Sequence, residues 1–164
     1  MSGSENPRGA NPLRFYVGSD HGGVAMRDRL SQLLVSWGHE VAATFGPSGA
    51  YEAVDYPDIA QALANALLTS EVPALGMLVC GTGQGMAIAA NKIPGIRAGV
   101  VADAFSARMI REHNNANVIC LGERVLGPEL AASALESFVG AEFAGGRHLR
   151  RVSKIVDLEG GTAT

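Results

Sequence analysis

Short apolar runs alternate along this chain with longer segments of helical periodicity, and this alternation constrains the fold more than any other feature. Runs rich in apolar and β-branched residues predict five strands, at Leu13–Gly18, Glu40–Phe45, Gly76–Cys80, Arg97–Ala102 and Asn117–Leu121. Apolar residues also recur at helical spacing in two segments, at Met26, Leu30, Leu33, Leu34 and Trp37, and at Ile59, Leu63 and Leu67. Further helices are expected at Gly85–Asn91, Ala104–Glu112, Pro128–Gly140 and Arg147–Leu158.

Repeated strand–helix units are typical of parallel sheets that carry helices on both faces. The chain therefore predicts a three-layer α/β/α, Rossmann-like fold with a five-stranded parallel sheet and a C-terminal helix. A length of 164 residues, 47% of them apolar, suits one globular domain. We expect this domain to span residues 13–158, with a flexible lead at 1–12 and a tail at 159–164.

Charge and composition argue against several classes of partner. The net charge of -3 disfavours a surface for polyanions, so we expect no nucleic-acid partner. No segment approaches the roughly 18 apolar residues that span a bilayer, and the first twelve residues lack the apolar core of a secretory signal. The two cysteines, Cys80 and Cys120, show neither metal-type spacing nor a disulfide framework. We expect a cytoplasmic protein with reduced thiols and a small ligand.

Open α/β sheets bind ligands outside the carboxyl ends of their strands. Polar and small residues gather at three such places in this sequence. The segment Ser19–Gly23, "SDHGG", follows the first predicted strand, and Cys80–Gly85, "CGTGQG", closes the third. Asp103 follows the fourth.

The glycine-rich loop after the third strand has several interpretations. A dinucleotide fingerprint needs a third glycine where Met86 stands, although Asp103 lies near the distance of the acidic residue that such sites use. A Walker loop needs a Gly-Lys-Ser/Thr that is missing here. Exposed N–H groups at the start of a helix also suit an oxyanion or a phosphate. The remaining alternative is a tight turn without a ligand.

Cys80 directly precedes this loop. A cysteine that ends an apolar strand is often a small buried residue. N–H groups and a helix start nearby would instead favour its thiolate form and make it reactive. Cys120 has a similar apolar approach but is followed by Leu121 rather than by glycines, so we interpret Cys120 as a core residue.

Two further clusters carry histidines. Asp20 and His21 stand before two glycines that allow a ligand to approach the backbone, and the alternative is that Asp20 caps the next helix. In "REHNNANVIC" the asparagines suit a helix end, which leaves His113 as an acid–base candidate.

The last predicted helix is amphipathic. Four cations fall at i, i+3, i+4 and i+7 on one side, namely Arg147, Arg150, Arg151 and Lys154. Leu149, Val152, Ile155 and Val156 occupy the other side. Like charges at this spacing repel, and a bound phosphate would relieve that repulsion. A solvated basic face is the alternative.

Together, the ordered segments "GSDHGG", "VDYPDIA", "CGTGQGMAIAANKIPGIRA", "REHNNANVICLGERV" and "GGRHLRRV" resemble one family. The chain is similar to ribose-5-phosphate isomerase B and the galactose-6-phosphate isomerase subunits from about Leu13 to Leu158. The resemblance implies an aldose–ketose isomerase that moves a proton between C1 and C2 of a phosphorylated sugar through an enediolate, without metal or nucleotide. It also implies a homodimer or tetramer whose pocket lies between subunits.

The resemblance implies a role for each matching residue. Cys80 would be the base, Thr82 would move a proton between O1 and O2, and Asp20 and His113 would open the sugar ring. The implied substrate ligands are His21, Tyr56, Gly81, Gly83, Gly85, Asn114, Arg147 and Arg151. A second branch of the family has Ser at the position of Cys80 and a Glu base at that of Met86, so Cys80 is the expected base here.

Ribose 5-phosphate and ribulose 5-phosphate are the expected substrate and product. Two departures from the commoner family pattern, the segment "GPSGAYEAVDYP" and Gln84, leave other sugar phosphates open, such as an allose, galactose or four-carbon phosphate. A non-catalytic module that binds a nucleotide or phosphate through the glycine loop and Asp103 is a further alternative.

Overall fold

The computed structural model describes residues 11–160 and contains one sheet of five parallel strands. The strands are β1 (Arg14–Ser19), β2 (Glu40–Phe45), β3 (Ala74–Cys80), β4 (Ala98–Val100) and β5 (Val118–Gly122). The helices are α1 (Val24–Ser36), α2 (Tyr56–Leu68), α3 (Gln84–Ala90), α4 (Ala104–Asn114), α5 (Pro128–Val139) and α6 (Leu149–Glu159). The short 3-10 turn η1 (Gly146–His148) precedes α6. The predicted fold class is confirmed.

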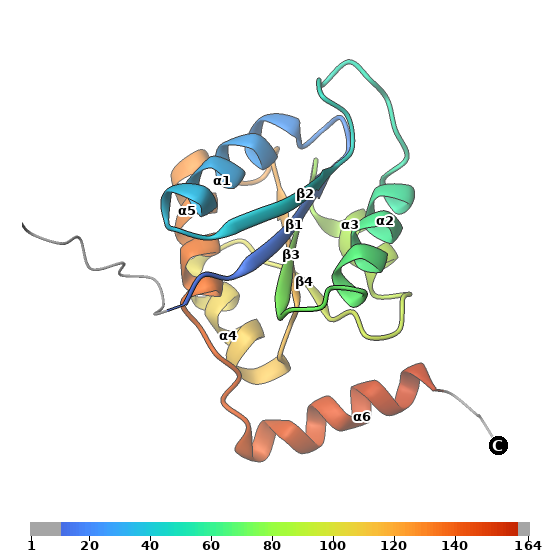
Figure 1. Cartoon of the computed structure of the whole chain (residues 1–164), viewed down its shortest axis with the longest axis vertical. Helices are drawn as coiled ribbons and strands as arrows, with labels where there is room; N and C mark the ends of the chain where they lie inside the picture. The colour runs from blue at the N-terminus through green and yellow to red at the C-terminus, as the bar shows by residue number, and fades with distance from the viewer. Residues whose placement is uncertain (1–10, 161–164) are drawn as a thin grey trace, which may run out of the picture.

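Helices cover both faces of the sheet (Figure 1), with α1, α4 and α5 on one side and α2 and α3 on the other. Alternate residues of β3 supply the two cores, because successive side chains of a strand point to opposite faces. Met77 and Val79 pack with α1 and α5, whereas Leu78 and Cys80 pack with α2 and α3. Burying each large apolar side chain contributes about 1.5–3 kcal/mol.

The strand order is β2-β1-β3-β5-β4, so the chain leaves β1 toward one edge and later returns to its other side. Strand β1 pairs with both β2 and β3. The loops that leave the carboxyl ends of β1 and β3 therefore run in opposite directions. Open α/β sheets form a ligand crevice at such a point. The loops of Asp20 and Gly81 lie at this point.

The observed boundaries differ from the predicted ones in two instructive places. Strand β4 is shorter than the predicted Arg97–Ala102, because the backbone N–H of Arg97 donates to the side chain of Asn117 (2.8 Å) instead of to a strand. The C-terminal α-helix begins at Leu149 rather than Arg147, because Gly145 and Gly146 have positive φ angles and lead into the 3-10 turn. Arg147 thus lies outside the helical face on which its spacing placed it.

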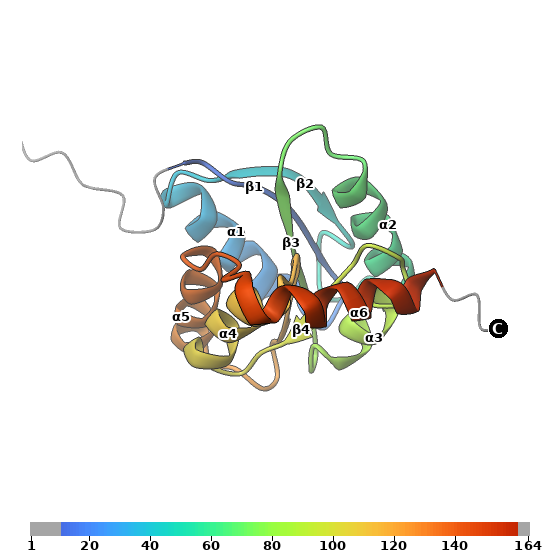
Figure 2. The ribbon, with the colours of Figure 1, turned by 90° about the horizontal axis from the view of Figure 1, so that it is seen from below.

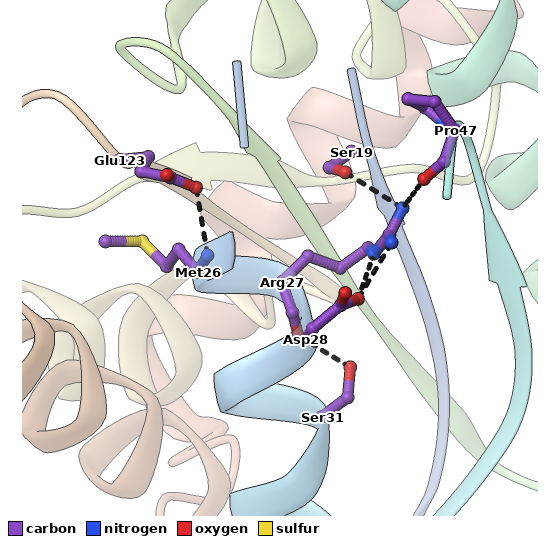
Figure 3. Close-up of polar contacts among 7 residues, drawn as sticks. All are labelled: Ser19, Met26, Arg27, Asp28, Ser31, Pro47 and Glu123. Carbon is purple, nitrogen blue, oxygen red and sulfur yellow. Dashed lines mark hydrogen bonds and ion pairs between the residues drawn. The ribbon is translucent and has the colours of Figure 1, made fainter. Parts of the chain in front are cut away.

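Polar contacts fix the start of α1 beside the crevice (Figure 3). Gly23 precedes the helix and has no side chain to cap it, and Glu123, from the segment after β5, accepts from the free N–H of Met26 at 2.9 Å. The buried Arg27 donates to Ser19 (3.1 Å) and to the carbonyl of Pro47 (2.9 Å). The helix start, the end of β1 and the segment after β2 are thereby joined. The reading of Asp20 as the cap of this helix is wrong.

Helix α6 crosses the end of the domain at which the strands begin (Figures 1 and 2). Val152 is its buried residue, while the other large apolar side chains of the helix are exposed, namely Leu149, Ile155, Val156 and Leu158. Glu159 accepts from the backbone N–H of Gly95 at 2.9 Å. A cavity of about 670 Å³ remains beneath the helix, lined in part by Ile96 and Ile110.

The predicted domain limits stay predictions at both ends. Residues 1–10 of the expected lead and 161–164 of the expected tail lie outside the described residues. Among residues 11–160, no helix is long and apolar enough to cross a membrane. In the same range, no three or more His, Cys, Asp or Glu residues are grouped so that they could hold a metal ion.

Candidate active site

The thiol of Cys80 lies at the carboxyl end of β3 and is 6% exposed. Its sulfur accepts from the backbone N–H of Gly83 at 3.1 Å. Gly83 has φ +79°, a left-handed conformation that favours glycine, and it bends the chain back toward the sulfur. This loop therefore combines a buried thiol with backbone N–H groups, the arrangement that suits a proton acceptor beside a developing oxyanion.

Thr82 and Tyr56 flank the same loop. The hydroxyl of Thr82 is exposed and accepts from the N–H of Gln84 at 3.4 Å. Tyr56, the first residue of α2, lies so close to Gly85 that a side chain there would meet the phenol ring at 2.8 Å. The absence of a side chain at Gly85 is thus what lets the ring border the loop.

The loop after β1 closes the other side of the crevice. The Asp20 carboxylate accepts from the N–H of Gly22 at 2.8 Å, and a methyl group on Gly22 would lie 3.4 Å from the N–H nitrogen of Gly81. Gly23 is pressed against β3, since a methyl group there would lie 2.6 Å from the carbonyl oxygen of Val79. The Nδ1 atom of His21 is buried and has no hydrogen-bond partner among the described residues. A ligand with a polar group would satisfy it.

Arg124 is the residue of this site that sequence reasoning missed. Its guanidinium lies between the two loops, 3.4 Å from where a methyl group on Gly81 would be and 3.7 Å from one on Gly22. Its backbone N–H donates to the carbonyl of Gly81 at 3.0 Å, which ties the segment after β5 to the glycine loop. The rule that selected the ends of the other strands would have found Arg124 if applied to the fifth strand, which ends two residues earlier at Gly122.

Three further residues that the sequence singled out have structural roles. Cys120 is fully buried in the core, as predicted, and burial raises the pKa of its thiol, so it stays protonated. Met86 is also fully buried, and its thioether cannot take a proton. Asp103 caps α4 by accepting from the N–H of Ser106 at 2.7 Å, and this hydrogen bond holds the pKa of Asp103 below its usual value. Asp103 therefore has a structural role as a helix cap.

The remaining predicted residues lie at the opposite end of the domain, where the strands begin. Helix α4 starts at the carboxyl end of β4 and spans 11 residues, so its last residues, His113 and Asn114, lie roughly 16 Å away along the helix. His113 stacks on His148, with ring centres 4.1 Å apart and planes 9° apart. Arg147 and Arg151 are exposed on the segment that carries His148. Asn115 forms the left-handed end of α4, so the helix-end interpretation is confirmed for this asparagine.

The structure therefore divides the predicted site residues into two groups. One, which we call the thiol end, lies at the carboxyl ends of β1 and β3 and holds Cys80, Thr82, Asp20, His21, Tyr56, Gly81, Gly83 and Gly85. The other, the histidine end, lies where α4 meets η1 and α6 and holds His113, Asn114, Arg147 and Arg151. The two groups do not meet within one chain.

The sequence profile of the ribose/galactose isomerase family matches residues 15–155. The chain belongs to this family. Among its relatives in the ribose/galactose isomerase family, ribose-5-phosphate isomerase B of Escherichia coli is 42% identical over 146 residues, which cover 89% of this chain and 96% of that protein. D-erythrulose-4-phosphate isomerase of Pectobacterium atrosepticum is 40% identical, with 87% of this chain and 93% of that protein covered.

Solved structures agree with this assignment. A structure of ribose-5-phosphate isomerase B from Clostridium thermocellum superposes with a TM-score of 0.86 at 46% identity, covering 90% of this chain and 98% of that one. The resemblance that the sequence motifs indicated is thus confirmed for the family and for the fold.

Proposed function

We propose that this protein is an aldose–ketose isomerase that interconverts ribose 5-phosphate and ribulose 5-phosphate. The observation that carries the proposal is the Cys80 thiol, held at the end of β3 against the N–H of Gly83. Family membership and a relative named ribose-5-phosphate isomerase B support this choice of substrate.

The proposed reaction uses Cys80 as the base. Its thiolate takes the proton from C2 of the open-chain aldose, the electron pair moves into a C1–C2 double bond, and the carbonyl oxygen O1 becomes negatively charged. Thr82 moves a proton between O2 and O1, and the thiol returns its proton to C1. The reverse sequence regenerates the aldose.

The glycine loop and Arg124 stabilise the charge that develops on the enediolate. Backbone N–H groups between Gly81 and Gly85 are held by the folded loop, so they need no reorientation when the charge forms. The guanidinium of Arg124 adds a positive charge beside Gly81. Preorganised donors of this kind contribute about 3–4 kcal/mol each in enzymes in which one has been removed.

Ring opening and phosphate binding require the histidine end. Ribose 5-phosphate is mainly a closed ring, and we assign its opening to Asp20 and His113. Arg147 and Arg151 would bind the phosphate together with His21, while Asn114 contacts the sugar. Since His113 and Cys80 lie at opposite ends of the domain, a second copy must supply one of them.

We therefore propose a homodimer, or a tetramer made of two such dimers, whose pockets lie between subunits. The exposed apolar side of α6, with Leu149, Ile155, Val156 and Leu158, supplies surface that a second copy would bury. If a second subunit packs against α6, Arg147 and Arg151 of the first subunit would also lie near the glycine loop of the second. A cytoplasmic location belongs to the same proposal.

The decisive experiment replaces the proposed base. Cys80→Ala should abolish solvent-deuterium exchange at C2 of ribose 5-phosphate, because no other group of the loop takes a proton from carbon, while binding of the sugar phosphate persists. Cys120→Ala is the matched control and should retain isomerase activity, since that thiol lies in the core. Wild-type turnover in Cys80→Ala would refute the assignment of the base.

A second candidate substrate is a four-carbon or six-carbon sugar phosphate. The relative named D-erythrulose-4-phosphate isomerase and the unusual segment 46–55 beside the crevice favour it. A panel of pentose, tetrose and hexose phosphates, compared by kcat/KM, separates the two. We expect the pentose phosphate to have the highest value, and a higher value for another sugar would reassign the substrate without changing the role of Cys80.

A further inference from the structure

We propose that His148 is a positioning residue for His113: its neutral imidazole ring stacks on the ring of His113 and holds it in the plane needed for sugar-ring opening. This inference rests on the proposed role of His113. It adds a function for a residue that the mechanism above leaves unused. His148 itself need not touch the sugar.

The stack is built by local backbone structure. The ring centres are 4.1 Å apart and the planes differ by 9°. Gly145 and Gly146 have φ angles of +61° and +51°, so the chain turns sharply just before His148. The N–H of Ala144 donates to the carbonyl of Glu112 at 3.0 Å, next to His113 in the sequence. The turn is thereby attached to the helix whose histidine it covers.

Hydrogen bonding indicates which form of His148 is present. The Nε–H of Arg147 is directed at Nε2 of His148 at 3.5 Å, a contact that favours the neutral ring with a lone pair on that nitrogen. The pKa of His148 is lowered, first by burial and then by electrostatic interaction with His113, Arg147 and Arg151, with Glu112 acting in the opposite direction.

A neutral partner matters because ring opening moves protons through His113. One of the two residues, His113 or Asp20, takes the proton of the anomeric hydroxyl, the C1–O4 bond breaks, and the other residue gives a proton to O4. Two positively charged imidazoles 4.1 Å apart would repel each other. A neutral His148 lets the ring of His113 take up its proton while the stack fixes its direction.

The test compares two directions of one reaction. Ribose 5-phosphate must be opened first, whereas ribulose 5-phosphate stays open-chain because its phosphorylated C5 hydroxyl is the group that would close a five-membered ring. His148→Ala in the full-length protein should lower kcat for the aldose by about tenfold or more, the scale of lost acid–base assistance. KM should change by no more than about twofold. Deuterium uptake into ribulose 5-phosphate should persist.

Enzyme concentration gives a second readout. With His148→Ala, part of the rate from ribose 5-phosphate should come from aldose that opens spontaneously in solution, so the rate per mole of enzyme should fall as enzyme is added. His148→Phe keeps a flat ring on His113 and should restore a rate proportional to enzyme concentration. Ser153→Ala, elsewhere on α6, is the control and should behave as wild type.

Three results would overturn the inference. One is a rate proportional to enzyme concentration in His148→Ala, the second is a change confined to KM, which would make His148 a phosphate ligand, and the third is loss of deuterium uptake in that variant. Deuterium uptake by the wild-type protein tests the proposed isomerase function separately. If the wild type shows uptake and His148→Ala matches it in every assay, only the inference fails.

Discussion

The thiol end and the histidine end of this chain are built in different ways. At the thiol end, backbone and burial set the geometry: Cys80 is 6% exposed, and Gly23 is packed against the carbonyl of Val79. At the histidine end, the predicted ligands are long side chains such as the exposed Arg147 and Arg151. The first is complete within one chain, whereas the second presents its groups outward. We infer that the chain carries its proton-transfer site itself and offers its phosphate-binding groups to a partner.

The largest expected effect tests whether the two ends act in different chains. Cys80→Ala should be inactive in isomerisation of ribose 5-phosphate, and His113→Ala should keep only the low rate that spontaneous ring opening allows. Mixed in equal amounts under conditions that allow subunits to exchange, they should recover about a quarter of wild-type activity, because about half of the dimers are mixed and each holds one intact site of two. The activity of the mixture is the measurement.

The matched control for this mixture pairs two variants of the same end. Cys80→Ala mixed with Thr82→Ala should gain nothing beyond the separate activities, since a mixed dimer then has a defect in each site. Recovery of activity in this control mixture, or no recovery in the mixture of Cys80→Ala and His113→Ala, would contradict the proposal that the two ends act in different chains.

The next effect contrasts one glycine from each end. Gly23→Ala places a methyl group 2.6 Å from the carbonyl oxygen of Val79, and we expect a loss in the free energy of unfolding of about 3 kcal/mol or more. Gly145→Ala meets no atom within 4 Å but strains a φ of +61°, for an expected loss of about 1 kcal/mol. Urea unfolding followed by circular dichroism measures both. Equal losses would show that the thiol end is no more tightly packed.

The smallest effect concerns α4, the helix that connects the two ends. The pKa of Asp103 is lowered by its hydrogen bond from Ser106, so its cap stabilises the fold above the ordinary pKa of an Asp and loses this effect as pH falls through the lowered value. Asp103→Ala should therefore lower the urea midpoint at pH 7, with a gap from wild type that narrows below about pH 4. A gap independent of pH would contradict the charged cap.

Local pattern was enough to predict the strand–helix order and the thiol end. The strand that ends at Cys80 and the helix with Leu63 are set by apolar periodicity, which is a property of neighbouring residues. Cys120 was correctly interpreted as core because an apolar run surrounds it and no glycine loop follows. The motif set also indicated the family correctly.

Contacts between distant segments were not predictable in the same way. The cap of α1 comes from Glu123, 97 residues from the N–H that it accepts, and the Arg124 guanidinium reaches a loop formed 43 residues earlier at Gly81. Arg147 was expected on an α-helix, but the two preceding glycines turn the backbone first. The spacing of residues along the chain does not encode these approaches.

By itself, the sequence determined the class of fold, the family and the position of the Cys80 thiol beside the glycine loop, because periodicity and short motifs are local properties of the chain. Only the tertiary structure decided that Cys80 and His113 lie at opposite ends, that Arg124 enters the crevice, and that His148 covers His113. These relations depend on how strands are ordered in the sheet and on where α4 and α6 run. They arise from packing between segments that are far apart in the sequence.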